Sequence, residues 1–133
     1  MDVVIITMSK WDGLYSSTIL AMAKEMSKQH RVFYIDHPYT LKDVAKDFRG
    51  IFKSHRRSAL LAWKPVAFRP PGHPPGFTAV TLPPVVPINF LPNGSVYELL
   101  SAQNDKILNA GLQHVLNEHS IKKYILLNSF NPF

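Results

Sequence analysis

The chain has 133 residues, of which 46% are hydrophobic, and it carries a formal net charge of +6 at pH 7. This length accommodates one domain with a buried core, and the absence of cysteine excludes disulfides and thiolate metal sites. No apolar run approaches the ~20 residues of a membrane-spanning helix, and the first residues lack the basic start of a signal peptide. We therefore expect a globular protein of the cytoplasm.

The first predicted element is a strand. Val3 to Ile6 form an unbroken apolar block, which is typical of a strand buried on both faces of a parallel sheet. Ser16 to Thr18 are favourable helix caps, and apolar residues recur after them at helical spacing, which predicts a helix to about Gln29. The loop between strand and helix should lie at the carboxyl edge of the sheet, where open parallel sheets bind ligands.

A second strand is predicted over residues 31–36, followed by a basic helix. The strand completes a β-α-β unit, so the two strands should be parallel. From Leu41 to Phe52 the apolar residues fall at helical spacing, which predicts one amphipathic helix. The same helix carries a stripe of cations formed by Lys42, Lys46, Arg49 and Lys53. Residues 59–63 are apolar, and their pattern fits either a further strand or a continuation of the helix.

Prolines dominate the segment from Lys64 to Asn93, which holds nine of the eleven in the chain. The proline-free residues 77–82 predict a strand, and the apolar residues among the prolines at 83–92 predict an ordered loop packed on the body of the protein. Ser95 and Glu98 form a capping-box pattern. It predicts a long helix to about residue 117, either continuous or broken near residues 103–105.

The last predicted element is a buried strand over Tyr124 to Leu127, with Asn128 and Ser129 at its carboxyl end. A parallel strand with nothing after it has no crossover helix to cover it. We therefore expect the chain to be a truncated piece of a longer protein. A truncated sheet would expose apolar surface and favour self-association.

Several classes of site lack their residue patterns. Dinucleotide binding needs a glycine-rich turn, and the loop after the first strand has only Gly13. The phosphate-binding GxxxxGK[ST] pattern and the acidic cluster of a phosphoacceptor domain are both absent. Apart from His114 and His119, which are five positions apart near a helix end, no two histidines have helical spacing. We therefore expect surface histidines and no bound metal.

The loop after the first strand carries the candidate site. Trp11 offers a flat apolar face on which a sugar ring could stack, and Asp12 offers an acceptor for its hydroxyls. The start of the following helix adds free backbone N–H donors. The candidate substrate-binding residues at this edge are Trp11, Gly13, Tyr15, Ser16, Ser17, Asp36, Asn128 and Ser129. The alternative is that Trp11 and Tyr15 pack in the core and Asp12 only makes a turn.

Four stretches resemble the amino-terminal part of bacterial glycosyltransferases with the GT-B fold, in the family-one and family-four-like group of cell-envelope and exopolysaccharide enzymes. They are DVVIITMSKWDGLYSST, RVFYIDHPYTLKD, LPPVVPINFLPNG and YILLNSFNPF. The resemblance implies an α/β fold of three layers with a Rossmann-like parallel sheet. Residues 1–133 would then be the incomplete, acceptor-side half of a GT-B enzyme, without the carboxyl-terminal donor domain.

The resemblance also implies an activity. It is the transfer of a sugar from a nucleotide-sugar donor to a hydroxyl of a cell-envelope or polysaccharide acceptor, without a cofactor or bound metal. The acceptor hydroxyl needs a base, for which Asp12 is the nearest candidate and His37 the next. The fragment alone is expected to be inactive. The alternative is a non-catalytic Rossmann-like module that binds a ligand or partner at the same edge.

The cationic stripe predicts a partner. Envelope acceptors are often lipid-linked, and an anionic leaflet attracts each nearby cation by about 1 kcal/mol. We therefore expect peripheral binding at the inner face of the membrane, with the solvated face of an ordinary helix as the alternative. Nucleic acid is not expected, because aromatic residues do not interleave with the basic ones.

Overall fold

The computed structural model describes residues 1–12, 17–35, 39–54, 56–87 and 91–128. The chain divides into two compact units. The first contains Met1–His37, Ala67–Thr81 and His119–Phe133, and the second contains Pro38–Val66 and Leu82–Glu118. Each unit has its own cluster of buried apolar side chains.

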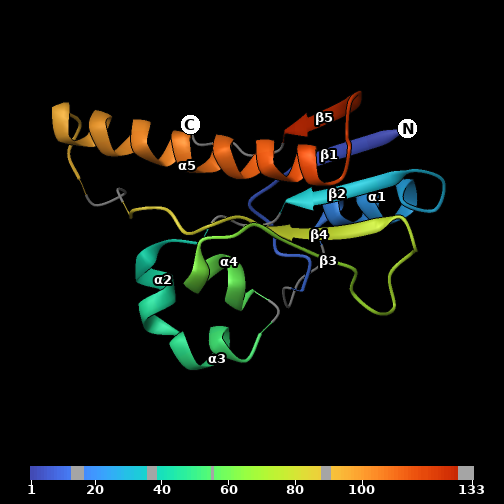
Figure 1. The fold of residues 1–133 in the computed structure, drawn as a ribbon, viewed down its shortest axis with the longest axis horizontal. Coiled ribbons are helices and arrows are strands. Elements are labelled where there is room, and N and C mark those ends of the chain that lie inside the picture. The colour runs from blue at the N-terminus through green and yellow to red at the C-terminus, as the bar shows by residue number, and fades with distance from the viewer. Residues whose placement is uncertain (13–16, 36–38, 55, 88–90, 129–133) are drawn as a thin grey trace. The chain divides into compact units, whose positions relative to one another are not determined.

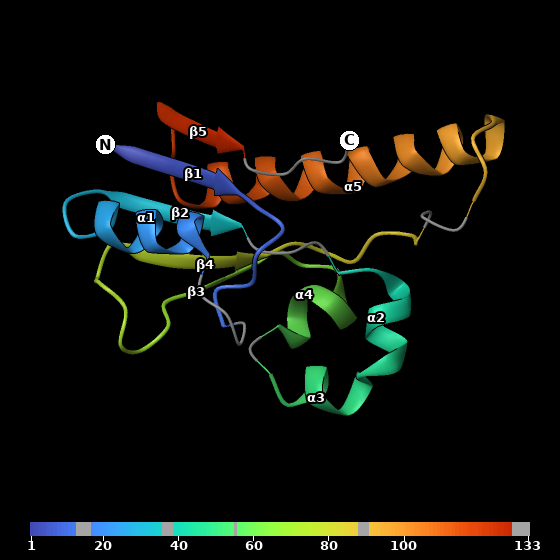
Figure 2. The ribbon, with the colours of Figure 1, turned by 180° about the vertical axis from the view of Figure 1, so that it is seen from behind.

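A five-stranded sheet in the order β3-β4-β2-β1-β5 underlies the first unit (Figure 1). Its strands are β1 (Asp2–Ile6), β2 (Arg31–Ile35), β3 (Val66–Phe68), β4 (Phe77–Thr81) and β5 (Tyr124–Asn128). β1 pairs in parallel with β2 and with β5, and β2 pairs in parallel with β4. In Figure 2 the arrowheads of these four strands point the same way. The four predicted strands are thereby confirmed, each to within one residue.

The order of the parallel strands indicates the fold class. Numbered along the chain, the four parallel strands lie across the sheet as third, second, first and fourth. Doubly wound, Rossmann-like sheets begin with this order. The predicted α/β class is confirmed, and the topology is compatible with a Rossmann-like fold. The sheet is mixed, however, and not wholly parallel as predicted, because the short strand β3 joins its edge. β3 lies between Pro65 and Pro70, and proline confines such strands to sheet edges.

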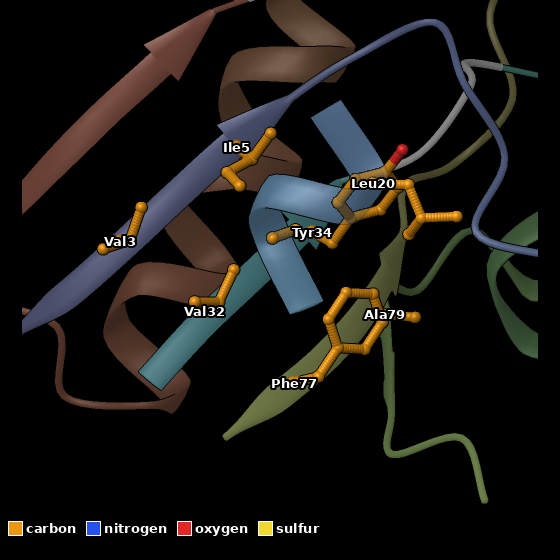
Figure 3. Packing of buried hydrophobic residues seen from close by; sticks show 8 residues of the cluster. Val3, Ile5, Leu20, Val32, Tyr34, Phe77 and Ala79 are labelled. Atoms are coloured by element: carbon orange, nitrogen blue, oxygen red, sulfur yellow. The ribbon is translucent and has the colours of Figure 1, made fainter. Parts of the chain in front are cut away.

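One face of the sheet packs against helix α1 (Thr18–Met26). Alternate side chains of a strand share a face, which places residues from three neighbouring strands together beside α1 (Figure 3). The buried cluster consists of Val3, Ile5, Val32, Tyr34, Phe77 and Ala79 from the sheet, with Leu20 and Ala23 from α1. Burial of each large apolar side chain stabilises the fold by roughly 1.5–3 kcal/mol.

β5 forms where it is predicted but is not buried. Tyr124, Ile125 and Leu126 are 37%, 46% and 48% exposed. In the sheet that the structure describes, β5 stands at one end of the strand order and pairs with β1 alone. The prediction of a buried strand is therefore wrong, because an apolar strand sequence does not reveal whether a neighbour covers it.

Three short helices occupy the first part of the second unit: α2 (Leu41–Lys46), α3 (Phe48–Phe52) and α4 (Arg57–Ala62). The single helix predicted over residues 41–52 is wrong, because the backbone breaks at Asp47, with φ −127° and ψ 43°. Asp47 and Gly50 both have low helix propensity. The break allows α3 to place Ile51 in a buried cluster with Tyr39 and Leu60. Residues 59–63, for which strand and helix were both open, are helical as far as Ala62.

The proline-rich segment after β4 is an ordered loop, as predicted, in the part that the structure describes. Pro83, Pro84 and Val85 are buried. The amide of Val85 donates to the carbonyl of Tyr39, and the amide of Leu41 donates to the carbonyl of Val85, both at 2.9 Å. These bonds hold the loop to the start of α2. Residues 88–90 lie outside the described residues.

Helix α5 (Ser95–Glu118) runs unbroken through residues 103–105. The carbonyl of Gly94 accepts from the amide of Glu98 at 3.0 Å, so the cap lies one residue before the predicted Ser95. Asn104 explains why a polar stretch is tolerated inside the helix. Its buried side chain accepts from the amide of Val86 and donates to the carbonyl of Val86, both at 2.9 Å.

We expect Asn104→Ala to lower the free energy of unfolding by about 1–3 kcal/mol, because it leaves two backbone groups of Val86 without partners. Urea unfolding measures the loss, and faster hydrogen exchange at the Val86 amide locates it. Asn109→Ala is the matched control, since Asn109 is exposed on the same helix. Equal losses in the two variants would contradict the role given to the Asn104 bonds.

Candidate functional site

The carboxyl ends of the parallel strands lie in register at one edge of the sheet. Ile6, the last residue of β1, is opposite Ile35 of β2 and Asn128 of β5, and Ile35 is opposite Val80 of β4. In doubly wound sheets, ligands bind outside the carboxyl ends at the point where the strand order reverses. Here that point lies between β1 and β5. The loop that leaves β1 therefore starts where the topology favours a site.

Hydrogen bonds to the sheet fix the start of this loop. The amide of Thr7 donates to the carbonyl of Ile35 at 3.2 Å, and the buried Thr7 hydroxyl oxygen accepts from the amide of Ser9 at 3.1 Å. The hydroxyl of Tyr34 donates to the carbonyl of Ser9 at 3.0 Å. The backbone is thus held as far as Ser9, three residues before Asp12.

Trp11 is half-buried and packs against the core cluster beneath α1. Its ring centroid lies 5.9 Å from that of Phe68 and 5.7 Å from that of His73, which it meets edge to face. This packing favours the alternative in which the Trp11 side chain packs in the core. A role for Trp11 in stacking a sugar ring stays a prediction.

Asp12 is exposed at the end of the described part of the loop. An exposed carboxylate at this edge can accept hydrogen bonds from ligand hydroxyls or remove a proton from one of them. Ser17 caps α1: its hydroxyl oxygen accepts from the amide of Leu20 at 3.2 Å, which confirms the predicted start of the helix. Asn128 is exposed at the end of β5.

Six of the candidate residues are not placed. Gly13, Tyr15, Ser16, Asp36, His37 and Ser129 lie outside the described residues. Among the residues that are described, no group of three or more His, Asp or Glu side chains is arranged to hold a metal ion.

The predicted cationic residues are all exposed, but they do not lie on one helix. Lys42 and Lys46 belong to α2, Arg49 belongs to α3, and Lys53 caps the end of α3. The break at Asp47 therefore interrupts the stripe. No helix of the described ranges combines the length and the apolar character needed to cross a bilayer.

Two exposed aromatic residues accompany these cations, and the sequence pattern had assigned them to the apolar face of the helix. Phe48 and Phe52 are 52% and 51% exposed, and their rings stack with centroids 6.2 Å apart. The guanidinium of Arg57 lies over the ring of Phe52 at 5.2 Å. Phe52 thus contacts both Phe48 and Arg57, and the cations Lys42, Lys46, Arg49 and Lys53 are exposed in the same stretch of the chain. We name these seven residues the aromatic and cationic surface.

Sequence reasoning missed a pocket at the opposite edge of the sheet. Arg31 opens β2 there, and Arg69 follows β3. The two arginines are 38 positions apart in the chain, so no local pattern connects them. Only the strand order brings them to one pocket.

Comparison of the chain with protein-family models, with curated proteins and with solved structures finds no match.

Proposed function

We propose that the chain is the acceptor-side domain of a glycosyltransferase, which moves a sugar from a nucleotide-sugar donor to a hydroxyl of a cell-envelope or polysaccharide acceptor. The position of the loop over residues 7–12 carries this proposal. It leaves β1 beside the reversal of strand order and ends in the exposed carboxylate of Asp12. The stretches that resemble GT-B enzymes include this loop and β5.

The proposed chemistry assigns one step to this edge. The acceptor hydroxyl attacks the anomeric carbon of the donor sugar, and the bond to the nucleoside diphosphate breaks. A carboxylate within hydrogen-bond reach of the hydroxyl takes its proton as the new bond forms. Asp12 is assigned this role, and His37 is the second candidate.

Glycosyl transfer by the product of the whole reading frame tests this proposal. The protein is incubated with UDP-, GDP- and dTDP-sugars together with envelope glycolipids, and release of nucleoside diphosphate is followed. Release that requires both donor and acceptor supports a transferase. Saccharide binding at the β1 and β5 edge without any release indicates the second candidate function, a non-catalytic binding module.

One observation favours that second candidate. Trp11 packs against the core and against two aromatic rings, so part of its face is covered. A module that binds a partner at this edge needs no open stacking platform. NMR titration of the chain with saccharides shows whether this edge binds a sugar, through shifts at the amides of residues 9–12 and of Asn128. Release of nucleoside diphosphate then separates a transferase from a binding module.

We further propose that the aromatic and cationic surface of the second unit binds anionic membranes. Exposed Phe rings next to cations are typical of segments that lie at the membrane interface. We expect the chain to sediment with vesicles that contain phosphatidylglycerol, to be released by salt, and to remain unbound with phosphatidylcholine alone. Phe52→Ala should weaken binding several-fold, because each buried methylene contributes about 0.8 kcal/mol.

Leu99→Ala is the matched control for Phe52→Ala. Leu99 is 71% exposed on α5, so this change also removes an exposed apolar side chain. Equal binding to neutral and anionic vesicles, or equal effects of the two substitutions, would contradict the membrane proposal.

A further inference from the structure

A pocket of about 290 Å³ lies at the amino ends of the strands in the first unit. It is distinct from the carboxyl edge discussed above, because the lining residues that come from the parallel strands β2 and β4 lie among the first three residues of each strand. Arg31 begins β2, and Gly76 and Thr78 lie at the start of β4. The lining also includes Phe33, Arg69 and His119, whose side chains affect what the pocket can bind. All of these residues belong to the first unit.

Arg31 makes three hydrogen bonds and keeps further N–H groups that could donate to a ligand. Its Nε and Nη2 donate to the two carboxylate oxygens of Asp2 at 2.7 and 2.6 Å, and its Nη1 donates to the carbonyl of His119 at 3.2 Å. A guanidinium has five N–H donors, so two are not engaged by any described residue. The guanidinium beside Asp2 also holds the pKa of that carboxyl below its usual range.

The second cation of the pocket is not neutralised. Arg69 is exposed, and no described residue forms an ion pair with it. Asp2 offsets the charge of Arg31, so Arg69 leaves the pocket with net positive charge. A guanidinium binds phosphate oxygens through parallel N–H bonds, which gives both affinity and orientation.

His119 adds an unsatisfied polar atom beside this pocket. Its Nε2 is buried and has no hydrogen-bond partner among the described residues. Buried polar atoms are nearly always paired with protein, water or ligand. The imidazole ring lies 5.0 Å from the ring of Phe33, and the Arg31 guanidinium lies 5.5 Å from the same ring. Phe33 is buried, so its ring supports Arg31 and His119 from beneath the pocket.

We propose that this pocket binds a small phosphate monoester. Arg31 and Arg69 bind the phosphoryl oxygens, and the short carbon part of the ligand packs against Ala67 and Pro75, the apolar lining residues that are not buried. The pocket volume lies just below the ~300 Å³ at which the range for small-molecule sites begins, which limits the occupant to a compact molecule. The proposal does not depend on glycosyl transfer, which is assigned to the other edge of the sheet.

NMR titration of the isotope-labelled chain tests the proposal, with glycerol 3-phosphate, inorganic phosphate and uncharged glycerol as probes. We expect saturable shifts at the amides of Ala67, Gly76 and Thr78, with tighter binding of glycerol 3-phosphate than of inorganic phosphate, and no shifts with glycerol. Arg69→Gln should raise the Kd roughly tenfold, because it removes one charged partner of the phosphate. Since Arg69 forms no ion pair with the described residues, this variant should fold normally.

Arg49→Gln is the matched control, because it removes the same charge from an exposed arginine of the second unit. An unchanged Kd in Arg69→Gln, equal effects of Arg69→Gln and Arg49→Gln, or shifts spread over the second unit would overturn the proposal. Absence of saturable shifts with either phosphate would overturn it as well.

Discussion

Asp12→Ala should lower the turnover of glycosyl transfer by about 10²–10⁴-fold, the range typical of a lost general base. The expected loss is in kcat, because the carboxylate acts on the proton as the new bond forms, whereas binding of the acceptor uses other groups as well. Asp12→Asn keeps the size and the hydrogen-bonding oxygen of the side chain but cannot take a proton. It should therefore be nearly as inactive as Asp12→Ala. Steady-state rates at varied acceptor concentration separate kcat from KM.

A structural role of Asp12 in its turn would give a different result. Loss of the turn should lower the melting temperature of the protein and should be repaired largely by Asp12→Asn. Asp105→Ala is the control, since Asp105 is an exposed carboxylate on α5. Unchanged turnover in Asp12→Ala, with Asp105→Ala also unchanged, would remove Asp12 from the mechanism and leave His37 as the candidate base.

Gly76→Ala should be strongly destabilising, by about 3 kcal/mol, which is the upper end of typical overpacking costs. An added Cβ at Gly76 would lie 2.4 Å from the carbonyl oxygen of Ser27 and closer still to that of His30. Both obstacles are backbone atoms, so neither can rotate away. The carbonyl of Gly76 also accepts from the amide of Val32 at 2.8 Å, and movement of Gly76 would break that bond beside the core. The free energy of unfolding in urea measures the effect.

Gly94→Ala is the control for this substitution. A Cβ at Gly94 would meet no atom within 4 Å, and its only cost is the weaker helix cap, under about 1 kcal/mol. Faster hydrogen exchange at the Val32 amide should accompany the loss in Gly76→Ala. Equal stability of the two variants would show that the turn after α1 can shift to make room for the added Cβ. It would contradict the predicted destabilisation.

The sequence predicted the edge of the sheet at which the candidate site lies. Apolar blocks that end in polar residues predicted parallel strands with a shared carboxyl edge, and the pairing of Ile6 with Ile35 and Asn128 confirms that edge. The direction of the Trp11 side chain was not predictable. It depends on Phe68 and His73, which follow in the chain only after the second unit begins and which contact Trp11 through the fold.

The helix break at Asp47 shows a similar limit. The spacing of apolar residues from Leu41 to Phe52 is helical throughout, yet four of the six are exposed: Leu41, Ala45, Phe48 and Phe52. The spacing of apolar residues predicts which of them could share a face of a straight helix. It does not predict that the chain must turn for Ile51 to be buried with Tyr39 and Leu60.

The sequence by itself determined the local features of this protein: the four parallel strands to within a residue, and the cap of α1 to within residues 16–18. These depend on side-chain pattern and backbone propensity over a few neighbouring positions. The tertiary structure alone decided which strand lies at the edge, why Asn104 is tolerated inside α5, and that Arg31, Arg69 and His119 line or border one pocket. These features depend on contacts between segments far apart in the chain. The pattern of neighbouring residues does not predict such contacts.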